Sequence, residues 1–543
     1  MTKPGLPLMT SVGALLALSA CMTTDPSVRL ANRTWNKELI YLDQGWGEER
    51  IQQYYHAPEG TFLMPYSWAN ALISLAGKAS LLDLVEKQGA LKDDPSAANP
   101  DGLPVGFVLD DREFRSSRPW LGVTCALCHA GELRFGDHRI RIPGGTSQVD
   151  YPGLLDQLLG RLSQTESNQA SFDAFAKKVL GENAATDAIS KLQADVKSLL
   201  KPVRRFEAER ARLLPYPFGP YRLDALQLGF VNGQFAQDPE TTIDIPPANA
   251  PVSFPSVWHG PWRDNVQYSI QIHSPLPRNI VQAVNSSSVW PDVPFRNVHF
   301  QNLIAIEEWL RDLRPPQWPE DILGAVDFSK AARGRELFRE HCQRCHHWNR
   351  TEPNEAGFSF LKTIEVPNNN PKMGTDPTQI KFTIDSATDR MPKLFRLTNG
   401  LMNGFFQAAK LSEAARVQAT RGKDNIWRPR EGYAASALDG IWATPPYLHN
   451  GSVPTLYDLL SPVSKRPTKF RLGSGKYDPQ KVGFASDGHF EFDTSIPGNS
   501  NSGHTWGTDL EEPDRFALVE FLKVVREWGI PSLARQATEI VRQ

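Results

Sequence analysis

Two five-residue segments, Cys125-Ala-Leu-Cys-His129 and Cys342-Gln-Arg-Cys-His346, constrain this chain more than any other feature. Each has the form C-x-x-C-H, which attaches a c-type haem. Two thiols one turn apart can add to both vinyl groups of one porphyrin, and the histidine that follows can bind its iron. The sequence therefore predicts two covalently bound haem c groups, with attachment through Cys125, Cys128, Cys342 and Cys345 and proximal iron ligation by His129 and His346.

A zinc site is the alternative use of these four cysteines. Structural zinc is held by four ligands that converge on one ion. The two cysteine pairs, far apart in the sequence, would then have to meet, and both histidines would be left over. The haem interpretation uses all six residues, and we favour it for that reason.

The N-terminus predicts export. Lys3 is followed by the apolar run 12–18, which ends at Leu18-Ser-Ala-Cys21 and resembles the lipobox of bacterial lipoproteins. We expect residues 1–21 to be a signal peptide and Cys21 to become the acylated first residue of a periplasmic or cell-envelope protein, since several acyl chains give stable anchoring. The alternative is an ordinary signal peptide with an incidental cysteine, which exports the chain equally.

Composition and net charge limit the kinds of partner that this chain can be expected to bind. The chain has 543 residues, 40% of them hydrophobic and 22% charged, which is typical of globular domains. Its net charge of −2 argues against nucleic acid as a partner. We expect contact with a membrane through the lipid anchor only, because no second long apolar run follows the first.

The pattern of elements predicts a mainly α fold: two cytochrome c-like haem domains with long irregular loops and a few short β-hairpins. Apolar spacing favours helices over 151–212, and alternation around a Gly-Asp turn favours a hairpin over 133–142. A helix over 329–342 leads into the second motif, and another over 509–528 closes the chain. We expect a leader over 22–110, a first haem domain over 111–314 and a second over 320–543.

The two motifs, together with the segment Ala443–Leu456, resemble the bacterial di-haem cytochrome c peroxidase superfamily. Within it, further segments resemble the rubber-oxygenase-like di-haem cytochromes c: Leu121–Cys125, Ile142–Gly145, Phe218–Leu226, Gly374–Pro377 and Asn499–His504. The likeness covers most of the chain after about residue 40, and the superfamily contains several chemistries.

The resemblance implies axial ligands for the second haem. His504 lies in a Gly/Asn/Ser loop where the rubber-oxygenase branch supplies a distal histidine, so it predicts His346/His504 coordination. His449 matches the Tyr-x-His-Asn-Gly pattern, which implies a role near the second haem and on the path between haems. Peroxidases of the superfamily carry a methionine where this chain has Val463, so we expect a lower potential here.

The resemblance implies a less defined distal side for the first haem. Relatives close that pocket with aromatic residues, which makes Phe254 and Trp258 its expected walls. His259 and His273 are alternative ligands. We expect an open or weakly capped iron that binds peroxide or dioxygen.

The predicted function is an exported di-haem oxidoreductase. The first haem would activate peroxide or dioxygen, and the six-coordinate second haem would pass an electron. Its partner would be a small-molecule oxidant or an electron-donor or electron-acceptor protein. The alternative is a non-catalytic electron-transfer cytochrome with both irons capped, and a weaker third interpretation is a redox sensor or scaffold. Peroxide, dioxygen with a polyisoprene-like chain, and a protein side chain all remain open as substrates.

Overall fold

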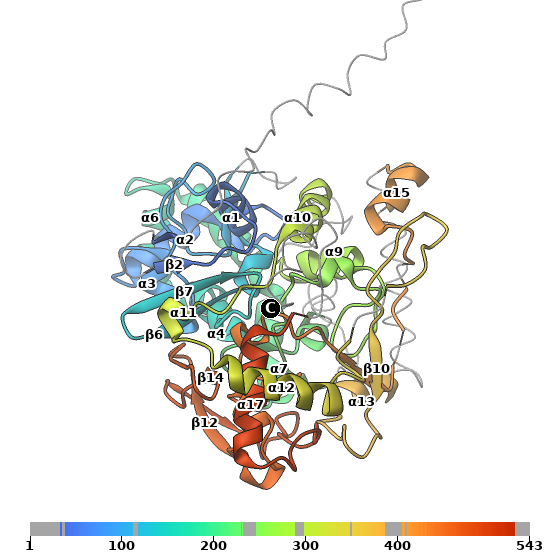
Figure 1. Ribbon diagram of the computed structural model, residues 1–543. Helices are drawn as coiled ribbons and strands as arrows, with labels where there is room; N and C mark the ends of the chain where they lie inside the picture. The colour runs from blue at the N-terminus through green and yellow to red at the C-terminus, as the bar shows by residue number, and fades with distance from the viewer. Residues whose placement is uncertain are drawn as a thin grey trace, which may run out of the picture.

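The computed structural model describes residues 33–34, 39–111, 118–229, 231, 246–287, 298–347, 350–385, 404, 406–407, 410–424, 426–428 and 430–526 (Figure 1). The predicted signal peptide and Cys21 lie outside these ranges. Within them, no helix combines an apolar sequence with the length needed to traverse a bilayer.

Small sheets frame the first C-x-x-C-H motif. One sheet has the order β1-β2-β7-β6, with β1 (Arg33–Thr34), β2 (Leu39–Tyr41), β6 (Ala130–Phe135) and β7 (His138–Pro143). Strands β6 and β7 pair antiparallel around Gly136, whose φ of +56° suits glycine, which confirms the predicted hairpin. A second sheet has the order β3-β5-β4, with β3 (Met64–Pro65), β4 (Phe107–Asp110) and β5 (Trp120–Val123). Strand β5 runs directly into the motif.

Helices cover the next stretch, as predicted for 151–212. They are α4 (Tyr151–Leu155), the π-helix η3 (Asp156–Gly160), α5 (Arg161–Ser167), α6 (Gln169–Leu180) and α7 (Thr186–Leu213). Phe172 and Phe175 of α6 are fully buried, and Phe175 meets Trp68 with ring centres 6.2 Å apart. This apolar contact fixes α6 against the N-terminal helix Tyr66–Leu75.

Helices α12 (Phe328–His341) and α17 (Glu512–Val524) pack across one another (Figure 1). Their backbones approach closely at Gly334, where a Cβ atom would lie 2.0 Å from the carbonyl oxygen of Ala517. The rings of Phe338 and Phe521 lie 5.2 Å apart beside this crossing. The predicted pairing of an opening helix before the second motif with a closing helix is confirmed.

The remaining elements connect these parts. The helices are α1 (Glu48–His56), α2 (Tyr66–Leu75), α3 (Leu81–Val85), α9 (Pro275–Asn285), α10 (Phe300–Asp312), α11 (Glu320–Leu323), α13 (Thr378–Asp385), α15 (Glu413–Thr420) and α16 (Leu456–Leu459). The 3₁₀-helices are η1 (Glu86–Gln88), η2 (Cys125–Leu127), η4 (Gly260–Trp262), η5 (Ile441–Ala443) and η6 (Val463–Lys465). Two-stranded sheets join β8 (Arg222–Leu223) to β9 (Val252–Ser253), β10 (Ile364–Pro367) to β11 (Gly432–Ala435), β12 (Lys469–Leu472) to β15 (Phe490–Asp493) and β13 (Tyr477–Asp478) to β14 (Gly483–Phe484).

The predicted fold class was wrong in its main statement. Helix covers 41% and strand 14% of the structure, so helix predominates, but the helices are mostly short and alternate with small sheets. Two cytochrome c-like haem domains are not found, because β5 rather than a helix leads into the first motif. One hydrophobic core also joins Trp46, Leu303 and Leu518, which come from the predicted leader, first domain and second domain.

Candidate haem site

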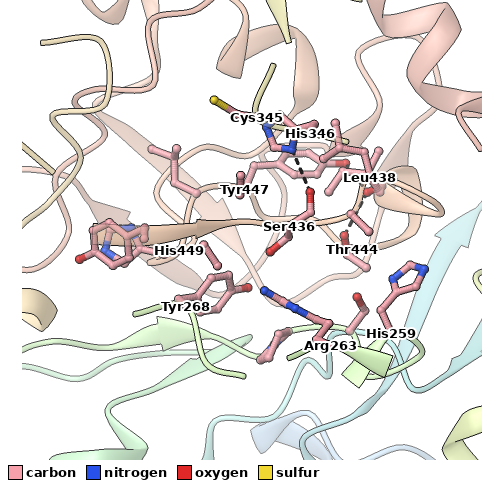
Figure 2. A pocket seen from close by; sticks show the side chains of 18 of the residues that line it. His259, Arg263, Tyr268, Cys345, His346, Ser436, Leu438, Thr444, Tyr447 and His449 are labelled. Carbon is pink, nitrogen blue, oxygen red and sulfur yellow. Dashed lines mark hydrogen bonds between the residues drawn. The ribbon is translucent and has the colours of Figure 1, made fainter. Parts of the chain in front are cut away.

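Both C-x-x-C-H motifs face one continuous cavity. Its volume is about 490 Å³, within the range typical of sites for bound small molecules. Figure 2 shows part of its wall, with His346 and Cys345 on one side and His449 and His259 at opposite ends of the view. The motif residues and candidate ligands that line it are Cys125, His129, His259, Cys342, Cys345, His346, His449 and His504.

The first motif is mostly buried, with Cys125 and Cys128 partly exposed. Strand β5 ends at Val123, and the Thr124 hydroxyl then accepts the amide of Ala126, which starts the tight turn η2. The amide of Cys125 donates to Glu59 Oε1 at 2.6 Å. Burial raises the pKa of the Glu59 carboxyl to about 7, although this hydrogen bond opposes the shift. The motif is thus held by a carboxyl from a segment far away in the sequence.

His129 is oriented as an iron ligand. Its Nδ1 donates to the Pro255 carbonyl at 2.9 Å, which leaves the Nε2 lone pair for a metal. Burial, followed by the charge of Arg278, lowers the pKa of His129 to about 3, so the imidazole is neutral. Tyr54 donates its hydroxyl to the His129 carbonyl at 3.2 Å and fixes the backbone.

The second motif orients His346 in the same way. Its Nδ1 donates to the Ser436 carbonyl at 2.8 Å (Figure 2), and burial lowers its pKa. The ring of His504 lies 6.3 Å from that of His346, centre to centre. Two imidazoles that bind one metal from opposite sides have ring centres about 6 Å apart, since each metal–nitrogen bond is about 2 Å and each centre lies about 1 Å behind its nitrogen. The observed spacing fits an axial pair.

A buried guanidinium shapes the loop that carries His504. Arg466 donates from Nη1 to the carbonyls of Asn501 and Gly503, at 2.6 and 2.8 Å, and from Nη2 to the carbonyl of His504 at 3.2 Å. The amide of His504 donates to Met373 at 2.7 Å, and its φ is +46°, uncommon for a residue with a side chain. Burial lowers the pKa of His504 to about 3, which keeps this imidazole neutral as well.

His449 lies in the cavity wall rather than opposite either proximal histidine. Its ring stacks on Tyr433 with centres 4.1 Å apart, and Tyr268 meets it edge-on at 6.5 Å. Burial lowers the pKa of His449 to about 4, although Asp376 opposes the shift. The carbonyl of His449 accepts the amide of Ser253 at 2.8 Å, which ties this loop to strand β9.

The aromatic residues expected around the first haem lie against His129 and in the main core. Phe254 meets His129 edge-on at 6.4 Å and therefore contacts the ligand imidazole. Trp258 is 1% exposed and packs in the main core beside Gly440. Neither is among the residues that line the cavity, so their role as walls of a distal pocket stays a prediction. His259 does line it, whereas His273 instead lies 3.2 Å from Asp424.

Polar residues that sequence analysis missed also face the cavity. Arg263 and Arg278 place cations there, and arginines of this kind can bind the propionates of a haem. Glu307 is held by the side-chain amide of Asn279 at 2.5 Å, and burial raises its pKa. These residues come from α9, α10 and a loop without a recognisable motif, and their partners are distant in sequence. No local pattern could have revealed them.

The donor set fits haem c better than zinc. Cys125, Cys128, Cys342 and Cys345 form no disulfide with one another. Across the part of the chain that the structure describes, no three His, Cys, Asp or Glu side chains converge as a metal site would require. Free thiols from both motifs and two neutral imidazoles line one cavity, which matches covalent porphyrin attachment with protein-supplied axial nitrogen.

Comparisons with known proteins agree with this chemistry. A family model described as RoxA-like, cytochrome c-like matches residues 432–471, the segment that contains Ser436, His449 and Arg466. The chain is 32% identical over 576 aligned positions to the uncharacterized protein y4iJ of Sinorhizobium fredii, covering 90% of this chain and 93% of that protein. It is 31% identical to the uncharacterized protein y4iM of the same organism, over 45% of this chain and 52% of y4iM.

Proposed function

The chain belongs to the same family as protein y4iJ and carries a RoxA-like cytochrome c segment, which implies haem c binding. From this premise we propose that it is an exported oxidoreductase with two covalent haem c groups. One group, at the first motif, reacts with peroxide or dioxygen. The other, at the second motif, would be held by both His346 and His504 and would pass electrons.

One observation carries this proposal: the two proximal histidines differ in what faces them. His346 has His504 at a ring distance of 6.3 Å, which suits coordination from both sides. The ring neighbour of His129 is Phe254, and no imidazole pairs with His129 in this way among the residues that the structure describes. His129 would therefore hold a group that can take an exogenous ligand, whereas His346 and His504 together would hold a group that cannot.

Haem c supplies one-electron and oxygen chemistry when bound, and the protein supplies ligands, orientation and charge. The carbonyls of Pro255 and Ser436 hold the two proximal imidazoles in one tautomer and increase their basicity. Arg278 and Glu307 line the cavity beside the first motif and can donate hydrogen bonds or protons at its surface. Phe254 packs against the His129 imidazole, and Trp258 packs in the main core.

Export and anchoring form part of the same proposal. A c-type haem is attached outside the cytoplasm, and the segment ending at Cys21 provides both the export signal and the acylation site. Mass spectrometry of the mature N-terminus should identify an acylated Cys21. An unmodified mature terminus elsewhere would remove the anchor and leave the haem chemistry unaffected.

Electron paramagnetic resonance on the purified holoprotein tests the central claim. We expect one high-spin and one low-spin ferric haem, with cyanide converting the high-spin signal only. Two low-spin haems that do not bind cyanide would contradict catalysis and favour a pure electron-transfer cytochrome. Intact mass showing one haem would contradict the two-haem proposal itself.

A further inference from the structure

The cavity opens to solvent beside the second motif. Of the residues that line it, those with exposed side chains are Glu340, Arg344 and Lys372. Glu340 and Arg344 lie within two residues of Cys342. The carbonyl of Lys372 accepts the amide of Thr505, next to His504, at 2.8 Å. The group held by His346 is therefore the one that a large partner can approach.

Cations continue from this opening along α12. Arg335, Arg339 and Cys342 follow one another at intervals of four and three residues, so they share one stripe of the helix. Both arginines are exposed, because the opposite face, with Gly334 and Leu337, packs on α17. We call Arg335, Arg339, Arg344 and Lys372 the cationic collar.

The collar is not neutralised by the protein. Neighbouring cations on α12 are paired, since Arg333 lies 2.8 Å from Asp514 and Lys330 lies 3.2 Å from Asp327. The four collar residues form no ion pair within the part of the chain that the structure describes. The whole chain carries a net charge of −2, so this positive surface contrasts with the rest of the molecule. Glu340 is the one carboxylate among the exposed lining residues, and the collar cations outnumber it; an excess of one charge around an opening is a feature of surfaces that steer charged partners.

We propose that the cationic collar is the docking surface for a small acidic redox protein that exchanges electrons at the second motif. This inference rests on the proposed haem at that motif and adds the class of partner. One electron leaves the reduced partner, which is oxidised, and arrives at the iron held by His346; no bond forms or breaks. Electrostatic complementarity of this kind raises association rates and makes them sensitive to salt.

The test is stopped-flow reduction of the holoprotein by a photoreduced, acidic plant-type ferredoxin. The wild-type second-order rate constant should fall as salt is added, since the attraction is screened. The double variant R335E/R339E should react about tenfold more slowly at low salt. R335K/R339K should keep the wild-type rate, because the attraction depends on charge and not on guanidinium geometry. The rate of R335Q/R339Q should lie between those of R335K/R339K and R335E/R339E.

A matched control separates local from overall charge. K78E/K178E makes the same change in net charge at two exposed lysines near α3 and α6, away from α12 (Figure 1). Its rate should stay within about twofold of wild type. Reduction by the small neutral lumiflavin semiquinone should be equal in all variants, which shows that electron entry itself is intact.

Several results would overturn the docking proposal. Equal slowing of R335E/R339E and K78E/K178E would show that the effect depends on net charge alone. A wild-type rate in R335E/R339E would show that the collar is not a docking surface. The wild-type protein could instead bind anionic lipid vesicles in a salt-sensitive way while the collar variants react with ferredoxin at the wild-type rate. That result would assign the surface to a membrane. Because haem content and spin state are measured separately, a closed first haem would refute the proposed function and leave this result intact.

Discussion

The same five-residue pattern occurs in two different environments, although all four of its cysteines are partly exposed. At the first motif, Ala126 and His129 are 1% and 3% exposed, and a strand leads into it. At the second, Gln343 and Arg344 are exposed, and helix α12 leads into it. The motif predicts the covalent chemistry, whereas the surroundings would decide access to each proposed haem. A buried group suits reaction with small molecules, and a group at an opening suits electron exchange with proteins.

Removal of the attachment thiols should produce the largest difference between the two motifs. C125S/C128S and C342S/C345S should each lose one of two haems by intact mass. The first variant should also lose most of its thermal stability, because the fully buried Tyr54 and its neighbours would then border an empty core cavity. The second variant should melt closer to wild type.

The control is the single variant C21S, which should keep both haems. Equal destabilisation by the two double variants would remove the proposed difference in burial. Retention of two haems by either variant would remove the covalent assignment on which the comparison rests.

The next prediction concerns axial ligation. His504→Ala should abolish the low-spin ferric signal, because His346 would lose the imidazole 6.3 Å away. His449→Ala is the matched control, since its ring stacks on Tyr433 instead of facing a proximal histidine. Electron paramagnetic resonance and added imidazole, which should restore the low-spin state in H504A, provide the measurement. An unchanged spectrum in H504A would assign the sixth ligand elsewhere.

The second half of the chain was the more predictable from sequence. The helix before Cys342 and the closing helix both have apolar residues at helical spacing, and α12 and α17 follow them. Ligation by His504 came only from family resemblance; the structure places it where that role requires, and the role stays a prediction. The hydrogen bonds by which Arg466 holds the loop of His504 could not be predicted, because a guanidinium that binds distant carbonyls leaves no periodic pattern in the sequence.

The first half shows why local patterns mislead. The four-residue strand β5 is too short to give a periodic signal, so no element was predicted directly before Cys125, although two cytochrome c-like haem domains were expected. Glu59 reaches that cysteine from 66 residues away, a contact that only the folded chain defines. The shared core of Trp46 and Leu518 likewise depends on packing between distant segments, which sequence periodicity does not report.

Close backbone packing offers a third way to separate the motifs. A Cβ atom at Gly106, where φ is +84°, would lie 2.3 Å from the amide nitrogen of Leu127 inside the first motif. At Gly334 it would lie 2.0 Å from the carbonyl of Ala517, beside the second. Gly106→Ala and Gly334→Ala should each destabilise the protein by about 3 kcal/mol or more, through overpacking.

Each variant should act on its own motif. Urea unfolding gives the loss of stability, and haem occupancy should fall at the first motif in G106A and at the second in G334A. Gly47→Ala is the control, since no atom lies within 4 Å of its added Cβ. Loss of the opposite haem in either variant would contradict separate support of the two sites.

The smallest expected effect is a pH dependence confined to the first motif. Burial raises the pKa of the Glu59 carboxyl from 4.5 to about 7. Between these values the unfolded chain has lost this proton while the folded chain keeps it, so the free energy of unfolding falls as pH rises through this window. Glu59→Gln removes the titration and still offers an oxygen to the amide of Cys125. The difference in the free energy of unfolding between E59Q and wild type should therefore shift by about 2 kcal/mol in favour of E59Q from pH 5 to pH 8.

Urea unfolding of the holoprotein at both pH values measures this gain. The matched control is Glu340→Gln beside the second motif, whose carboxyl side chain is 73% exposed and whose replacement should change stability little. Parallel pH profiles for E59Q and wild type would show that the Glu59 carboxylate is solvated or paired in the folded protein. The first motif would then be open to water near Cys125. Only its side around His129 would remain more buried than the second motif.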